Sequence, residues 1–171
     1  MRHKLALLAC ASALAACATP ASGPRAVATL APTAGNTASG TVEFVQSGSK
    51  VVVSGEVRGL KPNAEHGFHV HEKGDCSGPD GMAAGGHFNP GGKPHGQPGH
   101  GEHHVGDLPM LKADASGVAR FRVESEAMAV GSGPGDVVGR GLIVHKDADD
   151  YKTQPTGNSG ARIACAVIRR A

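Results

Sequence analysis

The sequence predicts an all-β fold, either an antiparallel sandwich or a barrel, on three observations. Glycine and proline make up 26 and 11 of the 171 residues, which disfavours long helices and favours turns. No segment carries a long apolar period of 3.6 residues with capping residues at its ends. Short apolar or β-branched runs recur instead, separated by turn sequences, and the length suits one domain.

Each expected strand is a run that either alternates apolar and polar residues or is rich in β-branched residues. Turn-forming residues at 46–49 and 113–117 separate neighbouring runs. The expected strands are 26–30, 41–45, 50–57, 66–71, 117–123, 141–145 and 162–168. The segments 72–107 and 146–160 are too long for simple connections, so we expect two functional loops.

The first 17 residues are predicted to be an export signal. A basic start precedes a short apolar run that ends in Leu14-Ala15-Ala16-Cys17, which resembles a bacterial lipobox. We therefore expect a signal peptide with a lipobox at 1–17, a lipid on Cys17, a flexible tether at 18–24 and one domain at 25–171. The alternative is ordinary secretion with cleavage nearby and no role for Cys17.

This signal predicts an exported, periplasmic protein that contacts a membrane only through its lipid. Ala18, rather than Asp, follows the lipobox and favours the outer membrane. The chain has 17 Lys and Arg and 15 Asp and Glu. Loss of Arg2 and Lys4 with the signal leaves equal numbers of each. With no basic tract and only 3% aromatic residues, the sequence predicts no nucleic-acid binding.

The cysteines predict one disulfide. Cys10 is lost with the signal and Cys17 is acylated, which leaves Cys76 and Cys165. In an oxidising compartment we expect this pair to be bonded. A loop of that length stabilises the fold by about 4 kcal/mol in the chain-entropy model.

Ten histidines in so short a chain point to metal. On the expected strand 66–71, His69 and His71 share one face, and Phe68 and Val70 share the other. Two residues of rise are about 6.6 Å, so the two rings can converge on one ion. The alternative is a pair of solvated histidines on a polar strand face.

A second candidate group lies in the first long loop. His87, His95, His104 and Asp107 provide three imidazoles and a carboxylate on a Gly- and Pro-rich backbone, a donor set that suits tetrahedral zinc. Gly106 is expected to permit the tight turn that returns Asp107 to His104.

The remaining histidines differ in their expected roles. His145 ends the strand 141–145 and could complete a nitrogen-rich site of the kind that suits copper. His66 is expected to lie in a turn or to be partly buried. His100 and His103 are expected to be solvated, with weak metal binding as the alternative.

Four motifs together resemble the copper–zinc superoxide dismutase family. They are GFHVHE at 67–72, GHFNP at 86–90, HVGDL at 104–108 and GNSGARIAC at 157–165. The stretch DDYKTQP at 149–155 resembles the secreted bacterial branch. The resemblance implies a Greek-key β-sandwich or flattened barrel of about eight strands with two long functional loops.

The resemblance also implies a site and an activity. Copper would be bound by His69, His71, His87 and His145, and zinc by His87, His95, His104 and Asp107. Asp149 would hydrogen-bond His69 and His95, Arg162 would attract the anion, and Cys76 and Cys165 would form the disulfide. The implied reaction converts superoxide to dioxygen and hydrogen peroxide with one copper and one zinc per chain, and protects the extracytoplasmic space. Arg162 and His87 would be the catalytic residues. A monomer and a homodimer both stay open.

Lysines in the two long loops could supply a local positive field. Lys146 and Lys152 are candidates for drawing the anion in, and Lys73 and Lys93 compete for that role. The alternative is that Lys146 and Lys152 are merely solvated.

A copper or zinc carrier on the same fold is the main alternative function, although it needs neither Arg162 nor the Asp149 link. A zinc hydrolase is disfavoured because no His-Glu-x-x-His pattern exists and the ligands fill zinc's four positions.

Overall fold

The computed structural model describes residues 23–171, which form strands and loops with a single short 3-10 helix. The all-β prediction is confirmed. The predicted signal peptide, Cys17 and tether residues 18–22 lie outside the described residues. The last tether position does contact the domain, because the Gln46 backbone N–H donates to the Pro24 carbonyl at 2.9 Å.

Strands follow the predicted runs closely. They are β1 (Arg25–Pro32), β2 (Ser39–Ser47), β3 (Lys50–Arg58), β4 (Glu65–His66), β5 (Phe68–His71), β6 (Leu111–Lys112), β7 (Ala119–Ser125), β8 (Gly141–His145), β9 (Arg162–Val167) and β10 (Arg169–Arg170). The helix η1 spans Met82–Ala84. The sequence did not predict β6 and β10, since two residues are too few to show an alternating pattern.

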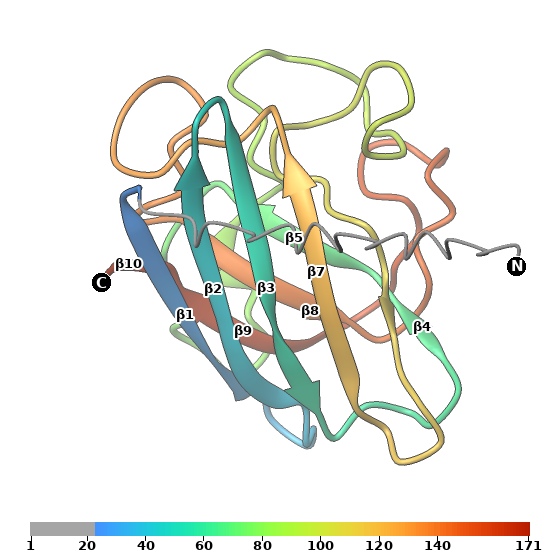
Figure 1. Cartoon of the computed structure of the whole chain (residues 1–171). Helices are drawn as coiled ribbons and strands as arrows, with labels where there is room; N and C mark the ends of the chain where they lie inside the picture. The colour runs from blue at the N-terminus through green and yellow to red at the C-terminus, as the bar shows by residue number, and fades with distance from the viewer. Residues whose placement is uncertain (1–22) are drawn as a thin grey trace, which may run out of the picture.

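The main sheet is antiparallel and has the order β5-β8-β9-β1-β2-β3-β7, with β10 also paired to β1. Its ends join strands far apart in sequence, β3 with β7 and β5 with β8, as the Greek-key prediction requires. The sheet curls, so that β1, β2, β3 and β7 form one side and β5, β8 and β9 cross behind them (Figure 1).

The structure corrects one strand. The run 66–71 was predicted as a single strand, but it divides at Gly67 into β4, which pairs with β6, and β5, which pairs with β8. The Gly67 N–H donates to the Asp147 carbonyl at 2.8 Å, and a Cβ at Gly67 would lie 2.6 Å from Ser159 Oγ. The second long loop thus crosses the chain at this glycine and separates the two strands.

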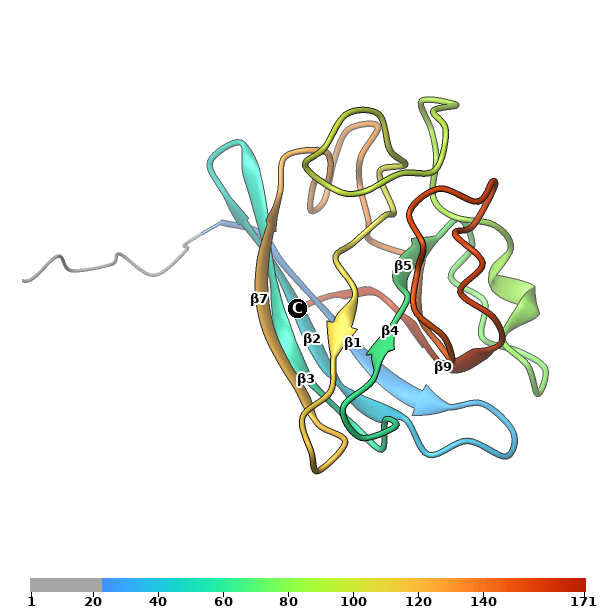
Figure 2. The same ribbon diagram turned by 90° about the vertical axis from the view of Figure 1, so that its right-hand side faces the viewer.

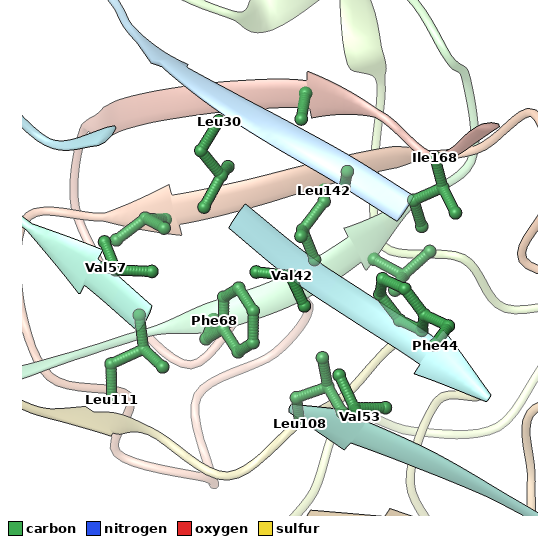
Figure 3. Packing of buried hydrophobic residues seen from close by; sticks show 14 of the residues in the cluster. Leu30, Val42, Phe44, Val53, Val57, Phe68, Leu108, Leu111, Leu142 and Ile168 are labelled. Carbon is green, nitrogen blue, oxygen red and sulfur yellow. The ribbon is translucent and has the colours of Figure 1, made fainter. Parts of the chain in front are cut away.

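The core lies between the two sides of the curled sheet. Inward-facing side chains from β1, β2, β3, β5 and β8 meet there, including Leu30, Val42, Phe44, Phe68 and Leu142 (Figure 3). All are at most 2% exposed. Burial of this apolar area stabilises the fold and leaves the opposite face of β5 and β8 for the loops.

The two long loops cover that opposite face. In Figure 2 the orange-red loop 146–160 lies beside β5 and β9, on the side of the molecule away from β7. Cys76 in the first loop is bonded to Cys165 in β9, with 5.8 Å between their Cα atoms, which confirms the predicted disulfide. Among residues 23–171, no helix is long and apolar enough to span a membrane.

Candidate metal centre

Strand β5 places two histidines on the loop side of the sheet. Phe68 and Val70 join the apolar core, and His69 and His71 point the other way, as the strand alternation predicts. The two histidines are nevertheless fully buried, because the loops cover them. Two solvated histidines, the alternative from the sequence, are therefore excluded.

The first long loop is laid along β5 by backbone hydrogen bonds. The Phe88 N–H donates to the Val70 carbonyl, the Val70 N–H to the Gly106 carbonyl and the Gly106 N–H to the Phe88 carbonyl, each at 2.8 Å. These bonds pair His87 with His71 and Asp107 with His69. Candidate metal ligands that are far apart in the sequence are thereby brought together beside β5.

Glycine is needed at position 106 for a different reason from the one predicted. The turn exists, since the Asp107 N–H donates to the His104 carbonyl at 3.2 Å. However, Gly106 is not among the left-handed glycines. A Cβ there would lie 2.1 Å from the Val70 carbonyl oxygen, so close approach to β5 is what requires glycine.

Four histidines meet in a first group, which we call the four-histidine group: His69, His71, His87 and His145. Their ligand atoms all lie within 4.8 Å of one another, and all four residues are buried. His145 follows a register shift between Val144 and His145 in the pairing of β8 with β9. Such bulges redirect side chains next to functional sites.

The nitrogens of this group fit a metal ion. In each of the four rings, one nitrogen is buried without a hydrogen-bond partner: His69 Nδ1, His71 Nε2, His87 Nε2 and His145 Nε2. The other nitrogen of His71 donates to the Gly85 carbonyl at 2.9 Å, and that of His145 to the Gly160 carbonyl at 3.2 Å. An unpaired buried polar atom costs about 1–3 kcal/mol, and a shared cation would pair all four. Four neutral imidazoles are a donor set that suits copper.

The second group, the three-histidine–aspartate group, contains His87, His95, His104 and Asp107. The Nδ1 atoms of the three histidines lie 2.9, 3.1 and 3.3 Å from Asp107 Oδ1 in that order. Asp107 Oδ2 accepts the His104 backbone N–H at 2.9 Å, which fixes the carboxylate's orientation. Three nitrogens and one oxygen at this spacing fit zinc.

One ring belongs to both groups. His87 Nδ1 lies 2.9 Å from Asp107 Oδ1 in the second group, while His87 Nε2 is one of the unpartnered nitrogens of the first. The ring centroids of His87 and His69 are 4.0 Å apart. The two groups are therefore joined through a single imidazole.

Asp149 links the groups by a second route. Its Oδ2 accepts from His69 Nε2 at 2.7 Å, and its Oδ1 accepts from His95 Nε2 at 2.9 Å. Burial raises the pKa of Asp149, but these hydrogen bonds outweigh burial and lower it below its usual range. Asp149 is thus an anion that accepts from Nε2 of both rings, which leaves Nδ1 as the nitrogen of each ring that can bind a metal.

Burial and carboxylates divide the histidines into two kinds. Burial lowers the pKa of His145 to about 3 and that of His87 to about 4. Burial also lowers the pKa of His95, but hydrogen bonds with Asp107 and Asp149 prevail and raise it to about 9. The first kind is neutral and ready to bind a metal, whereas at His95 a metal must displace a proton.

Arg162 lies beside the four-histidine group. Its Nη1 donates to the Gly81 carbonyl at 2.8 Å and its Nη2 to the Gly85 carbonyl at 2.6 Å. Gly85 also accepts from His71, so the guanidinium and a ring of the group share one carbonyl. Burial lowers the pKa of Arg162 below its usual range. Its fork of donors is held in place next to the group.

Among residues 23–171, three histidines join neither group. His66 was expected in a turn or partly buried, but it lies in β4 and is 1% exposed. Its Nδ1 donates to the His145 carbonyl at 2.9 Å, and its Nε2 has no hydrogen-bond partner. His103 Nδ1 donates to the His104 carbonyl at 2.7 Å, and His100 is exposed.

Two residues that support the site were not predicted from the sequence. They are Gly85, whose backbone carbonyl carries no sequence signal, and Gln154, whose side chain hydrogen-bonds the backbone of His95.

The loop lysines are all exposed. Lys93 Nζ forms an ion pair with Glu102 at 2.5 Å. Among residues 23–171, Lys73, Lys146 and Lys152 form no such pair. Their charges are therefore available to act on a small anion.

The fold and the site define a class: an antiparallel β-barrel metalloprotein with two adjacent metal-binding groups that share one histidine. Comparison with known proteins identifies the family. The model of the copper/zinc superoxide dismutase family matches residues 38–168. The chain belongs to this family.

Individual relatives agree with that assignment. The chain is 45% identical over 136 residues to the Cu-Zn superoxide dismutase of Paramecium bursaria Chlorella virus 1, covering 75% of this chain and 71% of the viral protein. It is 40% identical over 134 residues to Cu-Zn superoxide dismutase 2 of Aquifex aeolicus, covering 76% and 78%. The crystal structure of the clock protein EA4 superimposes with a TM-score of 0.78 and 41% identity, over 86% of this chain and 94% of that one.

Proposed function

We propose that this protein converts two superoxide ions and two protons into dioxygen and hydrogen peroxide, using one copper and one zinc per chain. The observation that carries the proposal is the four unpartnered buried nitrogens of the four-histidine group, one of them on the ring shared with the second group. When bound, copper supplies the one-electron redox change and zinc a fixed positive charge without redox chemistry.

The four-histidine group holds the copper in this proposal, and the three-histidine–aspartate group holds the zinc. Support comes from the donor sets: four neutral nitrogens in the first group, and three nitrogens with one carboxylate in the second. Soft and nitrogen-rich sites suit copper, whereas a closed set of four N and O donors suits structural zinc. This closed set also disfavours the zinc hydrolase.

Arg162 attracts and orients superoxide. It keeps its charge at physiological pH, and the Gly81 and Gly85 carbonyls hold its guanidinium beside His71. A positive charge fixed next to the copper-binding nitrogens lowers the energy of an incoming anion.

His87 moves a proton at Nε2. This atom faces the four-histidine group and has no protein partner, while Nδ1 is held at Asp107. A proton taken up at Nε2 is therefore directed at the place where peroxide forms, and His87 delivers it to that product.

The test compares superoxide consumption by protein loaded with both metals with that of an Arg162→Ala variant. We expect the variant to keep both metals and lose on the order of tenfold in rate, the low end of the gain from electrostatic steering. An Arg162→Lys variant, which keeps the charge but not the fork, is expected to fall between the two. Tight binding of both metals without superoxide consumption would instead establish a carrier.

Export with a lipid anchor is a second part of the proposal. We infer that residues 1–17 are a signal peptide, that Cys17 carries a lipid, and that the protein is periplasmic and held at the outer membrane. Support comes from the Cys76–Cys165 disulfide, which oxidising compartments favour. A relative 41% identical over 135 residues is named an extracellular Cu-Zn superoxide dismutase, from Caenorhabditis elegans.

Expression of the full chain in a Gram-negative bacterium tests the anchor. Mass spectrometry of the N-terminal peptide is expected to show acylated Cys17, and a Cys17→Ser variant is expected in the soluble periplasmic fraction. An unmodified N-terminus with the wild-type protein in the soluble fraction would contradict the anchor and leave ordinary secretion.

A further inference from the structure

Gln154 forms a reciprocal pair of hydrogen bonds with the backbone of His95. The His95 N–H donates to Gln154 Oε1 at 2.8 Å, and Gln154 Nε2 donates to the His95 carbonyl at 2.9 Å. One amide side chain thus satisfies both polar groups of one residue, in the way that a neighbouring β-strand would. The bonds cross from the second long loop to the first.

Beside this pair, the neighbouring backbone is held at Gly96, whose N–H donates to Asp107 Oδ2 at 3.2 Å. Residues 91–97 contain no strand or helix, and two glycines, at 91 and 92, precede His95 closely. Asn89 makes a similar reciprocal pair with Lys93, with bonds of 2.8 and 3.0 Å, but that clamp stays within the first loop. Within the described residues, the backbone of His95 itself is bonded by Gln154.

The second loop also holds the ring of His95. Asp149 Oδ1 accepts from His95 Nε2 at 2.9 Å, so one loop grips the residue at its backbone and at the far end of its side chain. His95 Nδ1 then faces Asp107 Oδ1 at 3.1 Å. With both ends held, the ring has little freedom to turn Nδ1 away from the three-histidine–aspartate group.

We propose that Gln154 is a positioning residue for the zinc group, fastening His95 from the second loop. This inference rests on the proposed assignment of His95, His104, His87 and Asp107 to zinc. Residues that orient a metal ligand through hydrogen bonds typically contribute about 10- to 100-fold to metal affinity. Gln154 is exposed and would otherwise pass for a solvated loop residue.

The experiment compares Gln154→Met with Gln97→Met. Methionine keeps the length of glutamine but removes both polar atoms at the clamp. Gln97 is the matched control, because it is exposed in the first loop, two residues after His95, and its side chain forms no hydrogen bond among residues 23–171. Zinc release from the protein loaded with both metals is measured as the absorbance change of a chromophoric chelator that takes up the released zinc.

We expect Gln154→Met to release zinc at least tenfold faster than wild type, and Gln97→Met to release it at the wild-type rate. Cobalt(II) in the zinc group gives a second readout: its visible absorption bands are expected to shift in Gln154→Met alone, because the ligand geometry changes. A loss of stability without repositioning would leave the spectrum of the bound cobalt unchanged, and that result overturns the proposal.

A second variant covers the case in which Gln154→Met folds poorly. Gln154→Glu keeps the acceptor for the His95 N–H but loses the donor to its carbonyl, so its release rate is expected between those of wild type and Gln154→Met. Wild-type release from Gln154→Glu together with an unshifted cobalt spectrum overturns the proposal.

The zinc assignment has its own control. Asp107→Ala is expected to abolish zinc retention. If Asp107→Ala held zinc as tightly as wild type, the zinc assignment would be wrong. If Asp107→Ala lost zinc but Gln154→Met released it at the wild-type rate, only the role of Gln154 would be contradicted.

Discussion

Individual histidines in this site differ in how strongly they compete with protons. His87 and His145 are buried among other rings, and their pKa values fall to about 4 and about 3. His95 lies between two carboxylates, Asp107 and Asp149, and its pKa rises to about 9. Residues of the same type therefore differ in how readily they give up a proton to a metal ion.

These shifts predict that the metal-free protein is most stable near pH 6.5. Below that pH the unfolded chain binds protons at His87 and His145, whereas the folded protein does not bind them until about pH 4 and about pH 3. The free energy of unfolding therefore falls as pH falls. Above it the folded protein holds a proton on His95 up to about pH 9 that the unfolded chain has lost, so stability falls as pH rises.

Chemical denaturation of metal-free protein from pH 4.5 to 9 measures this dependence. A His95→Gln variant is expected to lose the alkaline decline and keep the acidic one. Wild-type stability that does not decrease above pH 6.5 would show that the two carboxylates do not hold a proton on His95.

At the level of single residues, the sequence predicted much of the site. Alternation along 68–71 correctly assigned two histidines to one face and two apolar residues to the other. The motifs then indicated His87, His145 and Asp149. Gln154 could not be predicted, because its role depends on where a loop 59 residues away passes in space.

Among the elements, β5 organises the centre, since both the sheet and the first long loop pair with it. The loop pairs closely enough that a Cβ at Gly106 would lie 2.1 Å from the Val70 carbonyl oxygen. Loop residues that carry ligands are thus held by backbone geometry before any metal binds.

Gly106→Ala is therefore expected to be severely destabilising, by about 2–4 kcal/mol, because the loop must move off β5. The matched control is Gly86→Ala: it also precedes a candidate ligand, has no atom within 4 Å of the added Cβ and has no left-handed φ. Thermal unfolding and zinc content measure the effect. Equal stability and zinc content in the two variants would contradict the close-approach argument.

The disulfide fastens the same loop to β9. Cys76 packs against the cluster that contains Ala84, the residue before Gly85, and the Gly85 carbonyl holds Arg162, so we expect the bond to support the position of the guanidinium as well. Cys76→Ala is expected to lower the free energy of unfolding by about 2–5 kcal/mol. Dithiothreitol is expected to destabilise wild type but not the variant; an equal effect on both would show that the bond is not the source of the difference.

Strand prediction succeeded where the runs were long enough to alternate. It failed at Gly67, because the division of β4 from β5 depends on a hydrogen bond to Asp147 and on the nearby Ser159 side chain, which the local pattern does not contain. Likewise, the pairing of β3 with β7 joins strands that local sequence cannot match.

Across the whole molecule, charge is balanced once the first 17 residues are set aside, so attraction of superoxide must come from local charges. Exposed Lys73, Lys146 and Lys152 have no ion-pair partner among residues 23–171, whereas Lys93 is paired with Glu102. At 0.1 M salt, interactions between exposed charges are screened beyond about 10 Å, so added salt is expected to weaken the attraction between these lysines and the anion.

We expect the second-order rate constant for superoxide to fall on the order of tenfold between low and high ionic strength, the low end of steering effects. Replacing Lys73, Lys146 and Lys152 with glutamine is expected to reduce both the rate and its salt dependence. The matched control is the double variant Lys93→Gln/Glu102→Gln, which removes the ion pair without changing the net charge and is expected to change neither. A rate constant that is flat with salt would remove the steering role.

The central claim is that one imidazole, that of His87, joins a copper and a zinc. Diffraction from crystals of the metal-loaded protein, recorded on both sides of the copper and zinc absorption edges, tests it most directly. We expect one copper peak at His87 Nε2 among the rings of His69, His71 and His145, and one zinc peak at His87 Nδ1 beside Asp107. A His87 ring that touches only one ion, or either metal placed elsewhere, would contradict the account.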